Sequence, residues 1–109
     1  MSFDIKLSSN FEKEAKRLMK KYASLREEIE QLISSLSVNP IQGDSIGKNC
    51  YKIRVPISSK GKGKSGGARV ITNIVVLKNV VYLLTIYDKS DMDNISANDL
   101  KQMLKELPD

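Results

Sequence analysis

The sequence predicts an α+β domain that combines a mostly antiparallel, four-stranded sheet with a helical hairpin and a C-terminal helix. Three observations predict this class. Apolar residues recur at helical spacing in three segments, and each segment opens on a Ser-x-x-Glu or Ser-x-x-Asp capping pattern. Residues 50–57 alternate between polar and apolar side chains. Two later segments are rich in β-branched residues. The predicted order of elements is β-α-α-β-β-β-α.

The first third of the chain predicts one strand and two helices. Residues 2–7 alternate polar and apolar side chains, as a short half-buried strand does. The first helix is expected over 9–22 with its capping box at Ser9, and the second over 24–36 with its box at Ser24. The short separation predicts a hairpin of helices. Their apolar faces are expected to be core, because the opposite faces mix both signs of charge.

The middle of the chain predicts a loop, a strand and a second loop. Residues 39–49 contain Pro, Gly, Asn and Asp and are interpreted as a loop. The alternating strand over 50–57 is expected to end near Pro56, which cannot donate to a sheet ladder. Residues 58–67 are interpreted as a flexible basic loop. This loop is not a nucleotide-binding P-loop, because Ser58 stands where that motif needs glycine.

The last third predicts two central strands and a helix. Residues 68–78 and 80–87 are β-branched and apolar, and Lys78-Asn79 suggests the hairpin turn between them. A final helix is expected to open at Ser96 and to bury Leu100, Met103, Leu104 and Leu107. No repeat or domain boundary is evident, so residues 1–109 are expected to form a single domain.

Composition narrows the class of protein. The chain is 40% apolar and 28% charged, with no long apolar segment and no signal-peptide pattern, so we expect a soluble, cytoplasmic protein without a membrane partner. It has no histidine and one cysteine, Cys50, which excludes an internal disulfide and a Cys-x-x-Cys zinc site. Any catalysis must therefore use Lys, Arg, Tyr or carboxylate groups.

The positive charge is concentrated in one part of the chain. Residues 45–87 contain eight basic residues and no acidic one, whereas the net charge of the whole chain is +5. Such a stretch attracts polyanions. Lys52 and Arg54 would share one strand face with Cα atoms ~6.5–7 Å apart, a spacing that suits neighbouring phosphates. If the last three strands are antiparallel neighbours, these two side chains converge with Arg69 and with residues 87–89.

Three strings of residues resemble the RelE/ParE superfamily of toxins, and most of all its HigB-like branch. They are YKIR (51–54), SKGKGKSGGARVI (59–71) and YLLTIYDK (82–89). The resemblance implies a RelE-like fold over the whole chain. It also implies a toxin of a type II toxin–antitoxin system, an endoribonuclease that cleaves mRNA in the ribosomal A site. The implied chemistry is attack of a ribose 2′-OH on the adjacent phosphate, with no metal and no cofactor.

The resemblance also implies partners. These are a cognate antitoxin, expected to be a helix-turn-helix DNA-binding protein, the 70S ribosome with its mRNA, and operator DNA through the antitoxin alone. The implied catalytic residues are Lys52, Arg54, Arg69, Tyr87 and Lys89, with either Lys52 or Lys89 as the general base. The implied contacts to RNA or the ribosome are Lys48, Lys60, Lys62 and Lys64.

One departure from the family pattern lies after the last strand, where some relatives place an arginine and this chain has the acidic cluster Asp88, Asp91 and Asp93. These acids could reduce the positive charge of the site or cap the final helix, and we expect that they cap the helix and face solvent. Two alternatives stay open. The same fold could act as a ParE-like gyrase poison, because fold does not set the target. The chain could also be a non-catalytic RNA-binding relic.

Overall fold

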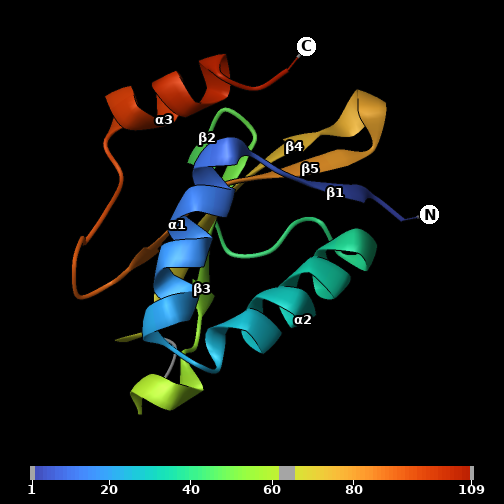
Figure 1. Ribbon diagram of the computed structural model, residues 1–109. Coiled ribbons are helices and arrows are strands. Elements are labelled where there is room, and N and C mark those ends of the chain that lie inside the picture. The colour runs from blue at the N-terminus through green and yellow to red at the C-terminus, as the bar shows by residue number, and fades with distance from the viewer. Residues whose placement is uncertain (1, 62–65, 109) are drawn as a thin grey trace.

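The five strands in the described part of the chain, residues 2–61 and 66–108 of the computed structural model, form one mixed sheet (Figure 1). Their order across the sheet is β1-β5-β4-β3-β2. β1 runs parallel to β5, and every other pair is antiparallel. The strands are β1 (Asp4–Leu7), β2 (Asp44–Gly47), β3 (Cys50–Val55), β4 (Ala68–Val75) and β5 (Val80–Asp88).

The α+β class and the element order are confirmed, but the sheet has one strand more than predicted. β2 lies inside the segment 39–49 that was expected to be a loop. It pairs with β3 over a short and irregular register and contains a single apolar residue, Ile46, so it has no alternation to detect. The turn to β3 places Lys48 and Asn49 at positive φ, the geometry of a tight two-residue hairpin.

The first two helices, α1 (Ser9–Lys21) and α2 (Leu25–Val38), pack on the same face of the sheet. Their apolar stripes form the main core together with alternate residues of β3, β4 and β5, as predicted. The cap of α1 differs from the prediction, because Ser8 and not Ser9 accepts the bond from Phe11 N at 3.0 Å. Ser8 also donates to the Leu84 carbonyl of β5 at 2.9 Å, so the sheet selects the cap.

The third helix, α3 (Ala97–Lys105), covers part of the opposite face and lies apart from α1 and α2 (Figure 1). Leu100 is buried there against Tyr82 and Leu84 of β5. The predicted cap is confirmed, since Ser96 accepts a bond from Asp99 N at 3.0 Å. No helix in the described segments is both long and apolar enough to span a membrane.

The connection from β3 to β4 is anchored at both ends. β3 ends at Val55, before Pro56, as predicted, and a short 3₁₀ turn, η1 (Ser58–Lys60), follows. Gly67 then passes so close to β3 that a Cβ atom there would overlap the carbonyl oxygen of Val55. Glycine at this position therefore allows β4 to begin directly beside β3.

Replacing Gly67 by Ala should lower the free energy of unfolding by about 3 kcal/mol, because two backbone segments would have to separate. Urea unfolding monitored by circular dichroism measures the change. Gly61→Ala is the matched comparison, since its added Cβ would meet open space and only its positive φ of 77° is unfavourable. We expect a loss of about 1 kcal/mol there. Equal stability of the two variants would contradict the close approach at Gly67.

Candidate functional site

Three functional candidates form a row across neighbouring strands. Arg54 of β3 lies opposite Arg69 of β4, and Arg69 lies opposite Tyr87 of β5. Directly paired residues of adjacent strands project from the same face of a sheet and contact each other. Lys52 lies two residues from Arg54 and therefore projects from the same face. The register of the strands thus places Lys52, Arg54, Arg69 and Tyr87 on one face of the sheet, as predicted.

The row is graded in exposure from one end to the other. Arg54 is exposed and Lys52 is half-buried, whereas Arg69 and Tyr87 are only 4% and 5% exposed. Arg69 donates from Nη1 to the Ala68 carbonyl at 3.2 Å, which orients its guanidinium group. An exposed cation on β3 and a buried, oriented cation on β4 are a suitable combination for binding an anionic group.

The Tyr87 hydroxyl is a buried polar group without a hydrogen-bond partner among the described residues. Burial raises the pKa of Tyr87, Arg69 opposes this effect, and Asp93 adds to it. The phenol is therefore protonated at neutral pH and can donate a hydrogen bond. Buried polar groups without partners are uncommon. One that lies beside a guanidinium group suits the binding of an oxygen from a ligand.

Lys89 follows β5 directly and is held on both its main chain and its side chain. Its amide donates to the Gly67 carbonyl at 3.0 Å, and its ammonium group pairs with Asp93 at 2.8 Å. Asp93 is 92% exposed, so this ion pair is weak and an incoming phosphate could replace it. The Lys89 ammonium thus lies at the end of the strand that carries Tyr87.

The capping role expected for the acidic cluster is wrong, whereas the expected exposure to solvent is confirmed for Asp91 and Asp93 and wrong for Asp88. Asp93 pairs with Lys89, and Asp88 is fully buried and pairs with Lys60 at 2.6 Å. The side chain that caps α3 is Ser96. Two lysines compete for these carboxylates more strongly than a helix terminus does, because an ion pair joins two full charges and a helix end carries only a partial one.

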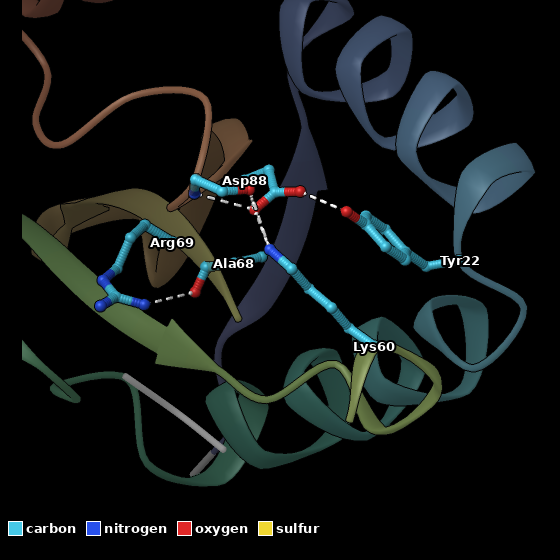
Figure 2. Close-up of polar contacts among 6 residues, drawn as sticks. Tyr22, Lys60, Ala68, Arg69 and Asp88 are labelled. Carbon is cyan, nitrogen blue, oxygen red and sulfur yellow. Dashed lines mark hydrogen bonds and ion pairs between the residues drawn. The ribbon is translucent and has the colours of Figure 1, made fainter. Parts of the chain in front are cut away.

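The lysines that the resemblance implies as RNA contacts lie in different places. Lys48 is in the β2–β3 turn, at the end of β3 away from Arg54. Lys60 is engaged by Asp88, on the face of the sheet where Tyr22 of α1 also contacts that carboxylate (Figure 2). Lys62 and Lys64 lie outside the described residues. Within the described chain, the cationic row is therefore not extended by Lys48 or Lys60.

Sequence reasoning missed the neighbours of two acidic residues near the site. Asp44 of β2 is the cross-strand neighbour of Lys52, and the two residues line one hollow with Arg54. Asp88 is the buried partner of Lys60. Asp44 could not be placed, because β2 itself has no sequence signal. Asp88 had one usable signal, since an acidic residue directly after a buried apolar strand needs a partner.

The arrangement is suited to binding phosphate and polarising it. Two guanidinium groups can contact phosphate oxygens, a protonated phenol can donate to a third, and Lys52 and Lys89 lie on either side of the row. Within residues 2–61 and 66–108, no three His, Cys, Asp or Glu side chains gather closely enough to hold a metal ion.

A protein family and several solved structures are similar to this chain. A family model described as "RelE toxin of RelE / RelB toxin-antitoxin system" matches residues 5–107. The isolated E. coli RelE toxin is similar in structure, with a TM-score of 0.64 and 17% identity over 97% of this chain and 100% of that one.

Two structures that include an antitoxin contain similar chains. The match within the intact E. coli RelBE toxin-antitoxin complex has a TM-score of 0.63 and 19% identity, over 80% of this chain and 96% of that one. An E. coli RelE mutant bound to a peptide of the antitoxin RelB has a TM-score of 0.62 and 17% identity, over 95% of each chain. These structures share the fold of this chain.

Proposed function

Since this chain belongs to the RelE toxin family, we propose that it is a ribosome-dependent endoribonuclease that cleaves mRNA in the A site and so inhibits translation. The observation that carries the proposal is the row of Arg54, Arg69 and Tyr87 on three neighbouring strands. This row offers two cations and a protonated phenol to one phosphate, with no acidic residue anywhere in 45–87.

The proposed reaction is an internal transfer at phosphorus. The ribose 2′-oxygen forms a bond to the adjacent phosphorus, the bond to the 5′-oxygen breaks, and a 2′,3′-cyclic phosphate end results. Lys52 or Lys89, in its neutral amine form, accepts the 2′-OH proton. Arg69 and Arg54 stabilise the charge on the phosphorane oxygens, and Tyr87 donates a hydrogen bond to one of them. A proton from solvent neutralises the leaving 5′-oxygen.

The proposal includes the dependence on the ribosome. The chain has no histidine, so its acid–base groups are poorly matched to neutral pH. Orientation of the substrate can supply a large share of a rate enhancement, and a ribosome could supply it. We propose that no metal or cofactor takes part. The whole chain would act as a single toxin domain of the HigB-like branch, on the basis of the three strings of residues.

The partners follow from the same proposal. The toxin would act in the cytoplasm on 70S ribosomes with bound mRNA, and a cognate antitoxin would neutralise it. Structures of E. coli RelE with its antitoxin RelB support a partner of this kind. We propose that the antitoxin is a helix-turn-helix protein and that operator DNA is bound through it alone.

Tightly controlled expression tests the proposed function. Induction should arrest growth, and mRNA from translating ribosomes should carry new ends within codons. Purified ribosomes programmed with a short mRNA should yield the same cut with the purified protein, and free mRNA should not be cut. Full induction with normal growth and intact mRNA would refute the proposal. Inhibition of gyrase supercoiling without mRNA cleavage would replace it by the ParE-like alternative.

Replacing Arg54 by Gln should slow cleavage by about 10- to 100-fold, the effect of losing one hydrogen bond to a charged group. The fold should not change, because Arg54 is exposed. Single-turnover cleavage on programmed ribosomes measures the rate. Arg26→Gln is the matched control, since Arg26 is an exposed arginine of α2, on the opposite face of the sheet. An equal loss of cleavage rate in both variants would show that the rate depends on net charge and not on the position of Arg54 in the row.

A further inference from the structure

Asp88 is a fully buried carboxylate that joins three segments of the chain (Figure 2). It accepts hydrogen bonds from Tyr22 Oη at 2.5 Å and from Lys60 Nζ at 2.6 Å. Ser90 donates to it from its amide at 3.0 Å and from its hydroxyl at 2.7 Å. The carboxylate therefore ties the end of α1 and the start of the basic loop to the end of β5.

We propose that Lys60 and Asp88 form a positioning pair, which holds the η1 turn and the end of β5 in place behind the candidate site, and that Lys60 does not contact RNA. This inference rests on the proposed function for its effect on cleavage. Its structural part concerns the free protein and is independent of any substrate.

The first argument is that the Lys60 ammonium is already occupied. Its side chain is only 12% exposed. Besides the bond to Asp88, Nζ donates to Ser90 Oγ at 3.0 Å and lies 5.6 Å from the centre of the Tyr22 ring. Breaking a buried ion pair leaves uncompensated charge, so an RNA phosphate would have to displace a desolvated and fully bonded partner. An exposed lysine would be a better phosphate contact.

The second argument is that hydrogen bonds to α2 and its N-cap fix η1, the turn that carries Lys60. Ser58 donates to Glu28 Oε2 from its amide at 2.9 Å and from its hydroxyl at 2.7 Å. Ser59 N donates to Ser24 Oγ at 3.0 Å. These bonds attach η1 to the start of α2. Lys60 is thus presented to Asp88 by a turn that has little freedom to present it elsewhere.

The third argument is that both ends of the basic loop meet at the same two residues. Lys60 at its start binds Asp88, and the Gly67 carbonyl at its end accepts from the Lys89 amide at 3.0 Å. Asp88 is also the cross-strand partner of Ala68, whose carbonyl orients Arg69. Figure 2 shows the Arg69 guanidinium group turned away from Lys60. The Lys60–Asp88 pair therefore does not lie among the side chains of the row, and it acts on them through the backbone.

The test compares Lys60→Met with Lys101→Met, an equal loss of charge at an exposed position of α3. Lys60→Met should slow maximal cleavage on programmed ribosomes by about 10- to 100-fold, the effect of a small displacement of catalytic groups. The protein concentration for half-maximal rate should change less than twofold. Lys101→Met should match the wild type in both quantities. A higher half-maximal concentration with an unchanged maximal rate would overturn the inference.

Salt dependence separates positioning from RNA contact. For single-stranded RNA, each lost phosphate contact lowers the slope of log K against log salt by about 0.7. Binding of a single-stranded oligoribonucleotide by Lys60→Met should keep the wild-type slope. A slope reduced by about 0.7 would make Lys60 an RNA contact and overturn the inference.

Hydrogen exchange tests the pair without any activity. The Lys89 amide should exchange at least about tenfold faster in Lys60→Met, since its bond to Gly67 depends on the anchored loop. Tyr22→Phe removes a single hydrogen bond to Asp88 and should accelerate exchange of the Lys89 amide to a smaller extent. This milder variant keeps the test valid if Lys60→Met does not fold. Unchanged exchange in both variants would refute the pair. If wild-type protein does not cleave mRNA, the proposed function fails and this readout still decides the positioning.

Discussion

Replacing Arg69 by Gln should reduce mRNA cleavage on ribosomes by about 100- to 1000-fold, the largest loss of any single substitution in the site. Arg69 lies in the middle of the row, between Arg54 and Tyr87, and it is buried. A charge that acts in a site of low polarity contributes more than one in water. Gln keeps a donor for the Ala68 carbonyl while it removes the positive charge. Single-turnover cleavage measures the effect.

Two controls accompany this prediction. Far-ultraviolet circular dichroism should show that Arg69→Gln is folded, and Arg26→Gln on α2 should cleave at the wild-type rate. Arg69→Lys should recover a part of the loss, because a lysine restores the charge without the planar fork of the guanidinium group. Wild-type cleavage by a folded Arg69→Gln protein would contradict the role of the row.

Replacing Asp88 by Ala should lower the free energy of unfolding by about 3–5 kcal/mol, the usual cost of removing one partner from a buried ion pair. The variant leaves the Lys60 ammonium and the Tyr22 hydroxyl without their acceptor. Thermal or urea unfolding measures the loss. Asp93→Ala is the matched control, because it breaks an exposed ion pair with Lys89 and should cost less than about 1 kcal/mol. An equal loss of unfolding free energy in the two variants would contradict the assignment of Asp88 to a buried ion pair and Asp93 to an exposed one.

The same pair predicts how stability depends on pH. Burial alone would raise the pKa of Asp88, but the hydrogen bonds from Lys60, Tyr22 and Ser90 outweigh it and hold the pKa well below its usual range. The unfolded chain therefore binds the proton more tightly, and stability rises with pH in this window. The contribution of Asp88 is complete above the unfolded pKa of about 3.9 and is lost as the pH falls below it. The gap between wild type and Asp88→Ala should narrow below about pH 4.

Local patterns predicted most of the elements because their signals are local. The alternation of 50–57 identified β3 and the face that Lys52 and Arg54 share, and Pro56 marked its end. The Ser96 box identified the start of α3, where the cap bond is present. A capping box or an alternating strand involves neighbours in the chain, so it can be recognised without knowing what lies across from it.

Elements without local signals were missed or misplaced. β2 is too polar and too short to be recognised, and it exists because the edge of β3 offers it backbone partners. Ser8 takes the cap of α1 in place of Ser9 because the Leu84 carbonyl of β5 holds its hydroxyl. In both cases a bond between distant parts of the chain decides between local alternatives of similar energy.

By itself the sequence determined the fold class, the basic middle of the chain, and the restriction of any catalysis to Lys, Arg, Tyr or carboxylate groups. The tertiary structure alone decided which cations lie next to one another. Arg54, Arg69 and Tyr87 lie side by side because of the register of three strands, and Lys60 forms an ion pair with Asp88, 28 residues further along the chain. The sequence shows which residues are charged. Which charges interact depends on their distance in space and on their burial, because ionic interactions weaken with separation and strengthen with burial.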